Sequence, residues 1–162
     1  MRGWSMKAAD QVWLAVAALE RASGSASGFS ASEIIEWIEE SGCGSARRDT
    51  IRAHVSSHNL ATAKPSPDRF RMLTRTSRGR VRLYRPGDPY HPDRAAGATA
   101  PESDTLPAEY RDLVDWYKGG RRTEDHAEAD SLLRLAAFMR STGVWRGIEP
   151  DAYVAELRAG WD

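Results

Sequence analysis

The feature that most limits what this chain can fold into is residues 86–107, PGDPYHPDRAAGATAPESDTLP. This stretch holds five of the eight prolines and almost no large aliphatic side chains. Proline cannot sit in a helix interior, and a segment of this composition favours an extended connection over a packed element. We therefore predict two folded parts, residues 1–86 and 107–162, joined by a Pro/Gly-rich linker at 87–106.

The charged residues are unevenly distributed, although the formal net charge is zero. Residues 47–85 contain eleven Lys/Arg against two Asp/Glu, a local net charge of +9. Residues 95–162 contain eight Lys/Arg against thirteen Asp/Glu, a net charge of −5. This asymmetry predicts a basic binding surface in the first part and an acidic region in the second.

The composition also bears on the class of protein and its compartment. A hydrophobic content of 41% and a charged content of 28% are typical of a globular chain. No apolar run approaches the roughly 18 residues needed to span a bilayer, and no signal-peptide pattern is present. The single Cys43 excludes an intramolecular disulfide. We expect a cytoplasmic protein with no membrane association.

Three helices are predicted before residue 60. The first covers residues 8–21 and ends at the tract SGSASG. A capping box of Ser30 and Glu33 predicts that the second helix begins there, and it ends at Ser41-Gly42. We expect Ser45 to cap the third helix, which runs to about residue 59.

Two strands follow these helices. The segments FRMLTRTS and RVRLYR flank Arg78-Gly79, and Val81 and Leu83 alternate with arginines in the second segment. This order resembles the winged helix-turn-helix family over residues 8–86, on the evidence of RRDTIRAHVSSHN followed by RMLTRTSRGRVRLYR. The resemblance implies a mainly α fold with a small β-hairpin, followed here by a C-terminal helical region.

Members of that family mostly bind duplex DNA, with the third helix in the major groove and the wing on flanking backbone. The residues agree with this, because short polar side chains opposite Ile51 and Val55 let a helix approach base edges. Arg52 and Asn59 are candidates for base contacts, and the hairpin arginines for phosphate contacts. The predicted DNA-binding residues are Ser45, Arg47, Arg48, Thr50, Arg52, Ser56, Ser57, Asn59, Arg75, Arg78, Arg80 and Arg82.

Metal and catalytic chemistry are less well supported. His54 and His58 are four residues apart and Cys43 is near in sequence, but a closed zinc site needs four ligands. No phosphate-binding loop, nucleophile elbow or zinc-protease motif occurs. The acids around His126 fit the dipole at a helix start. We therefore expect no metal, no cofactor and no enzymatic activity.

The C-terminal segment GVWRGIEPDAYVAELRAGWD is similar to the toxin-binding tail of VapB-like antitoxins, which wraps around a PIN-domain nuclease. The resemblance is carried by Trp145, Asp151, Tyr153, Val154, Leu157, Arg158 and Trp161, and it implies partner contacts through Trp145, Tyr153, Val154, Leu157 and Trp161. Aromatic side chains beyond a linker are also typical of partner binding by coupled folding. Three alternatives remain for residues 107–162: they form their own helical bundle, they pack on the first part of the chain, or they mediate dimerisation.

The sequence as a whole predicts a bacterial transcriptional regulator that binds double-stranded DNA specifically, with an antitoxin function implied by the tail. Two alternatives stay open. One is a winged-helix module that contacts proteins, and the other is an accessory subunit of a DNA-processing or restriction system.

Overall fold

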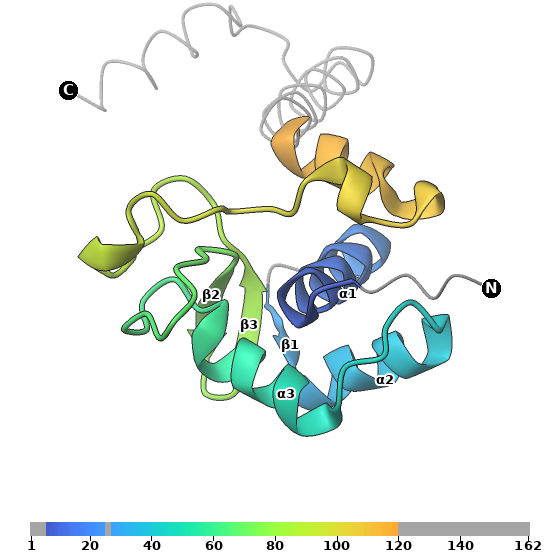
Figure 1. Ribbon diagram of the computed structural model, residues 1–162, viewed down its shortest axis with the longest axis horizontal. Coiled ribbons are helices and arrows are strands. Elements are labelled where there is room, and N and C mark those ends of the chain that lie inside the picture. Colours follow the sequence, from blue (N-terminus) through green and yellow to red (C-terminus); the bar gives the residue numbers. More distant parts are fainter. Residues whose placement is uncertain (1–5, 25–26, 120–162) are drawn as a thin grey trace, which may run out of the picture. The chain divides into compact units, whose positions relative to one another are not determined.

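The first helix, α1 (Ala8–Ser23), is covered on nearly all sides. Every residue from 9 to 17 is buried, including the polar Asp10 and Gln11. A helix with apolar side chains all round needs neighbours all round. Figure 1 shows α2 and α3 on one side of α1 and the segment after residue 100 on the other. The computed structural model describes residues 6–24 and 27–119.

The second helix, α2 (Ala31–Ser41), begins where the sequence predicts. The Ser30 hydroxyl accepts from the amide of Glu33 at 3.3 Å, and the amide of Ser30 donates to the Glu33 carboxylate at 2.7 Å. The helix ends at Gly42, which has a φ of 65° that favours glycine. The capping box and the predicted end of the helix are both confirmed.

The third helix is shorter than predicted and changes its hydrogen-bonding pattern. α3 (Arg48–Ala53) continues as a π-helical turn, η1 (His54–His58), in which the amide of Asn59 bonds to the carbonyl of His54. Ser45 does not cap it, because Arg47 occupies the N-cap position without a side-chain bond. The preceding loop is held instead by the side chain of Gln11, which accepts from the amide of Ala46 at 3.1 Å.

Three antiparallel strands form a small sheet in the order β1-β3-β2. β2 (Leu73–Ser77) and β3 (Arg80–Leu83) form the predicted hairpin around Gly79, whose φ is 73°. β1 (Phe29–Ser30) pairs with β3 and was not predicted, because two residues carry no alternation that a sequence pattern can reveal. The described residues are thus mainly helical with a small antiparallel sheet.

The segment 87–106 is a correction to the prediction, because it packs on the domain instead of forming an extended linker. Arg94 and Leu106 are both fully buried. The amide of Arg71 donates to the carbonyl of Ala98 at 2.9 Å, and a Cβ at Gly97 would overlap a neighbouring backbone oxygen. Short 3-10 turns form at Pro92–Arg94 and Ser103–Thr105, and in the first of them the amide of Ala95 donates to the carbonyl of Pro92 at 3.0 Å.

Residues 107–118 also belong with the N-terminal part of the chain. The rings of Tyr117 and Trp13 meet edge to face at 5.6 Å, and those of Tyr110 and Trp37 at 5.8 Å. Leu113 and Val114 join the same core. The chain accordingly divides into two units, Met1–Lys118 and Gly119–Asp162. The last elements of the described residues are a 3-10 turn at Ala108–Tyr110 and a helix at 112–119.

The part of the predicted C-terminal helical region that follows residue 119 lies outside the described residues. Within the described ranges, no helix combines the length and the apolar character that crossing a membrane requires.

Candidate nucleic-acid interface

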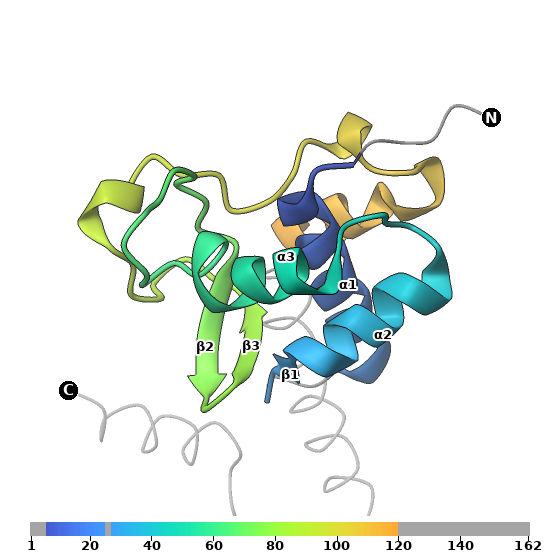
Figure 2. The same ribbon diagram turned by 60° about the horizontal axis from the view of Figure 1, so that its bottom comes forward.

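The outward face of α3 carries short or charged polar side chains. Ile51 and Val55 point into the core, with 1% and 5% of their surface exposed. Asp49, Thr50 and Arg52 are exposed on the opposite side. Figure 2 shows α3 across the front of the molecule, with the β2–β3 hairpin extending beside it. The helix face and the hairpin therefore form one surface, which we call the α3–hairpin face.

Three exposed arginines at the start of α3 and on the hairpin have no protein partner within the described ranges. Arg47 precedes α3, and Arg75 and Arg78 lie on the hairpin. All three are exposed, and within the described ranges none has a hydrogen bond or ion pair from its side chain. Cations held without a counter-ion on one surface are available to phosphate groups.

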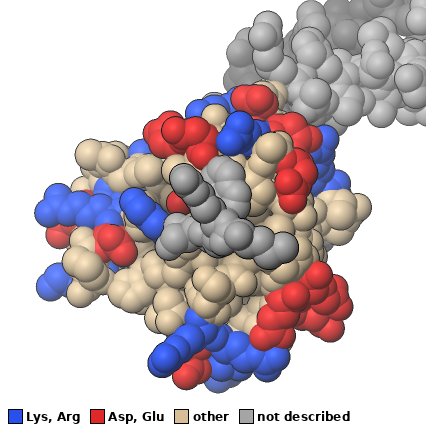
Figure 3. Space-filling model, turned by 45° about the vertical axis from the view of Figure 1, so that its right-hand side comes forward, with Lys and Arg blue, Asp and Glu red and all other residues tan. Residues whose placement is uncertain are grey.

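Other arginines predicted as phosphate contacts have protein partners. Arg48 makes a bidentate bond to Glu39 of α2 at 2.6 and 2.7 Å, and this hydrogen bond raises the pKa of the arginine. Arg80 donates to the carbonyl of Gly28 at 2.9 and 3.1 Å and lies near Glu33. Figure 3 shows the resulting mixture, with a basic group directly beside an acidic one. The basic surface is narrower than the local charge of +9 predicts.

Arg82, which was predicted to contact phosphate, has a carboxylate partner within the domain. Its guanidinium forms a bidentate bond to Asp88 at 2.7 and 2.8 Å, and only 18% of the side chain is exposed. Thr74, its partner across the hairpin, donates to the same carboxylate at 2.9 Å. Asp88 comes from the segment expected to be a linker, so the sequence pattern contained no sign of this pairing.

Asn59, which was predicted to contact bases, is completely buried, so its side chain is not on the surface of the domain. Its amide donates to the carbonyl of Ala9 in α1 at 2.9 Å, and its Oδ1 lies 2.8 Å from the Nδ1 of His54. The cause is the π-helical turn, which rotates less per residue than an α-helix. Residue 59 therefore lies on the same buried side of the helix as Ile51.

The serine and threonine residues predicted for the interface differ in their exposure and in their hydrogen bonds. Ser45 and Thr50 are exposed. The hydroxyls of Ser56 and Ser57 donate to the carbonyl of Ala53 at 3.4 and 3.1 Å, and Ser57 is half-buried. Thr50 is thus the hydroxyl on α3 best placed to meet a ligand.

The two histidines of the π-helical turn pack against each other. Their ring centroids are 4.9 Å apart, and His54 bonds to Asn59 within the same chain segment. Among the residues described, no group of three His, Cys, Asp or Glu side chains is placed to hold a metal ion. Cys43 is a free, half-exposed thiol in the loop after α2.

Two further features of this part of the chain bear on its surface. Asp49 stands on the α3–hairpin face with 97% of its side chain exposed. Arg71 lies over the rings of Tyr84 and Tyr90, at 5.3 and 4.6 Å from their centroids. No pattern pairs residues 71 and 90, because that contact depends on how the following segment folds back.

The predicted partner-binding residues Trp145, Tyr153, Val154, Leu157 and Trp161 lie outside the described residues. Comparison of the chain with family models, curated proteins and solved structures found no match.

Proposed function

We propose that residues 6–118 are a winged helix-turn-helix domain that binds double-stranded DNA as part of a bacterial transcriptional regulator. The order of elements, α1-β1-α2-α3-β2-β3, and the sheet order β1-β3-β2 support this fold. In the proposed complex α3 enters the major groove and the hairpin lies on flanking backbone.

One observation carries the proposal. Arg47 at the N-cap of α3 and Arg75 and Arg78 on the β2–β3 hairpin are all exposed, and none has a protein partner within the described ranges. Charged side chains that serve stability are commonly paired, as Arg48 and Arg82 are here. In such a complex the short polar side chains of the helix face the base edges in the groove, and the unpaired cations around the helix contact the phosphates on either side.

The Arg47→Ala, Arg75→Ala, Arg78→Ala triple variant should bind all duplex sequences more weakly. Each phosphate contact adds about 0.9 to the slope of log affinity against log salt concentration, so the slope should fall by about 2–3. Fluorescence anisotropy with a labelled random-sequence duplex at several salt concentrations measures this slope.

A matched control removes three cations from the opposite side of α1, through Arg21→Ala, Arg111→Ala and Lys118→Ala. Its salt slope should stay close to that of the wild type, because these residues lie on or against the segment that Figure 1 shows opposite α3. Equal losses in the two variants would mean that net charge alone attracts DNA, and a wild type without salt-dependent binding would exclude the phosphate-contact proposal.

A protein-interaction module is the second candidate. The observation that favours it is the pairing of Arg48, Arg52 and Arg80 with carboxylates, which makes the face a mixture of charges. Mixed charge suits a protein surface better than a phosphate backbone. The salt titration separates the two, since a protein module shows no affinity for duplex DNA at low salt.

The antitoxin function is proposed from the sequence of the tail alone. Deletion of residues 131–162 should abolish co-purification with a PIN-domain nuclease encoded beside this chain. DNA binding by the remaining domain should be largely unchanged, because the residues proposed to contact DNA all precede residue 119. Co-expression of the two proteins with a tag on the nuclease measures the first effect, and anisotropy measures the second. A complex that survives the deletion would place the nuclease contact elsewhere.

A further inference from the structure

Asp49 is an unexpected residue for a surface that binds phosphate. It lies on the outward side of α3 with 97% of its side chain exposed, beside the free cations of the α3–hairpin face. A carboxylate there repels a phosphate backbone and weakens binding to every DNA sequence alike. A role in base recognition would give this acid a function that offsets the repulsion.

The geometry links Asp49 to Arg52. Arg52 Nη1 donates to Asp49 Oδ1 at 3.1 Å, one helical turn apart on α3. Within the described ranges, Asp49 Oδ2 has no hydrogen-bond partner, and neither have Arg52 Nε and Nη2. The pair therefore presents two adjacent donors from one guanidinium edge beside one carboxylate acceptor. It holds these groups together before any ligand arrives.

This arrangement of two donors and one acceptor matches a G·C base pair better than an A·T base pair. In the major groove a G·C pair presents two acceptors, N7 and O6 of guanine, followed by a donor, N4 of cytosine. An A·T pair presents an acceptor, a donor and an acceptor in that order. A guanidinium edge meets both guanine acceptors, while at A·T one of its two donors faces the N6 amine of adenine.

We propose that Asp49 and Arg52 together read a single G·C base pair, with Arg52 donating to guanine and Asp49 accepting from cytosine. The inference rests on the proposed DNA-binding function and adds a sequence preference to it. Thr50 and the free arginines then position the protein, and the Asp49–Arg52 pair supplies discrimination at one position of the site.

The test selects duplexes from a random-sequence pool with the full-length protein and then measures affinities by anisotropy. One position should be fixed as G·C, and exchanging that pair for A·T should weaken binding at least about tenfold. In both Arg52→Ala and Asp49→Ala, the ratio of the affinities for the G·C and A·T duplexes should be close to one. Asp49→Ala should at the same time bind random duplex more tightly, and Arg52→Ala less tightly, because the charges differ in sign.

Arg21 and Asp112 provide a matched control, because they form an exposed Arg–Asp pair at 2.5 Å remote from α3. Replacing both by alanine should leave the G·C preference unchanged. If the wild type binds DNA in a salt-dependent way but selects no fixed G·C pair, the inference is overturned while the proposed function stands. The same holds if the G·C preference survives in both α3 variants or is lost in the control. A wild type without duplex binding overturns the proposed function itself.

Discussion

Arg94→Ala should lower the free energy of unfolding by about 3–5 kcal/mol, because it leaves four backbone carbonyls without their donor and each unsatisfied buried group costs about 1–3 kcal/mol. A domain of this size is stable by only about 5–15 kcal/mol, so the variant should be close to unfolding at physiological temperature. Chemical denaturation of the purified variant measures the change directly.

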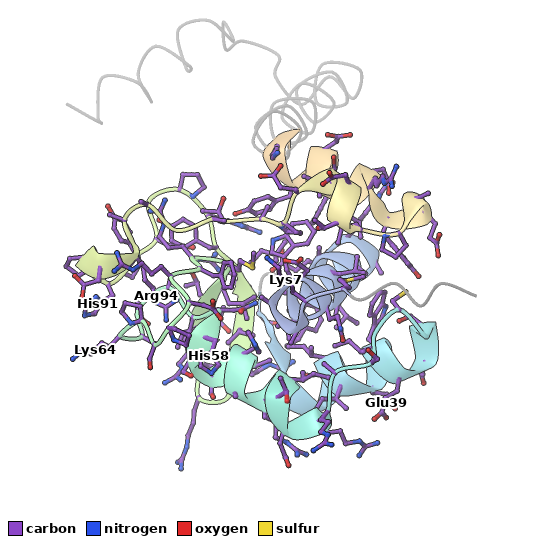
Figure 4. All side chains as sticks on the ribbon, in the orientation of Figure 1. Lys7, Glu39, His58, Lys64, His91 and Arg94 are labelled. Atoms are coloured by element: carbon purple, nitrogen blue, oxygen red, sulfur yellow. The ribbon has the colours of Figure 1, made fainter. Side chains whose placement is uncertain are left out.

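The physical reason is the number of backbone groups that one side chain satisfies. The Arg94 guanidinium donates to the carbonyls of Ala63 at 2.6 Å, His58 at 2.8 Å, Phe70 at 2.5 Å and Ser57 at 3.1 Å. Two of these carbonyls end the π-helical turn, where a cation is favoured by the helix dipole. Figure 4 shows Arg94 and His58 on neighbouring segments.

Arg94→Lys keeps the charge but offers three donors from one point, so it should recover only part of the loss. Arg69→Ala, an exposed arginine of the neighbouring loop, should change stability by less than about 0.5 kcal/mol. Hydrogen exchange at residues 57–73 should rise selectively in Arg94→Ala. A variant as stable as the wild type would restore the original view of residues 87–106 as a linker.

Local signals were sufficient to predict most elements of the domain. The capping box at Ser30 and Glu33, the αL glycine at residue 42 and the turn glycine at residue 79 each act within a few residues. The order of helices and the hairpin follow from such signals. Their contacts with one another do not, because contacts join residues that are distant in sequence.

The fold of residues 87–118 was not predictable from composition, since prolines and small residues also suit ordered irregular structure. One signal was nevertheless present. Residues 12–19 of α1, VWLAVAAL, are apolar around the whole circumference of the helix, so α1 requires cover on a second side. Leu106, Leu113 and Val114 provide that cover. A search for a partner of α1 would have assigned these residues to the first domain.

The predicted set of interface residues divides into exposed side chains and side chains with partners inside the domain. Arg47, Arg75 and Arg78 are exposed and free within the described ranges, while Arg82 and Asn59 are occupied within the domain. Whether an arginine faces a ligand or a neighbour depends on carboxylates elsewhere in the chain. For Arg82 that carboxylate is Asp88, and its contribution to stability gives the second large effect.

Asp88→Ala should lower the free energy of unfolding by about 2–4 kcal/mol, because it leaves the largely buried Arg82 without its carboxylate partner. The Asp88 carboxylate accepts from Arg82, from Thr74 and from the amide of Arg85 at 2.8 Å. Its backbone carbonyl accepts from the Tyr84 hydroxyl at 3.2 Å. These bonds fix the base of the hairpin, so hydrogen exchange in β2 and β3 should rise in the variant.

The same contacts predict an acid dependence. Burial raises the pKa of Asp88, but the hydrogen bonds from Arg82, Arg85 and Thr74 outweigh it and leave the pKa below its usual value of 3.8. A group with a lowered folded pKa stabilises the protein above its unfolded pKa, and this contribution is lost as the pH falls through the folded pKa. Unfolding of the wild type should therefore become easier below about pH 4.

The hydrogen bonds of Glu33 lower its pKa too, so the wild-type curve alone does not isolate Asp88. The difference between wild type and Asp88→Asn does, because both proteins keep Glu33. That difference should be largest near neutral pH and should shrink as the pH falls below 4, whereas Asp104→Asn, at an exposed acid, should track the wild type throughout. A difference that does not change with pH would show that Asp88 contributes through packing and not through its charge.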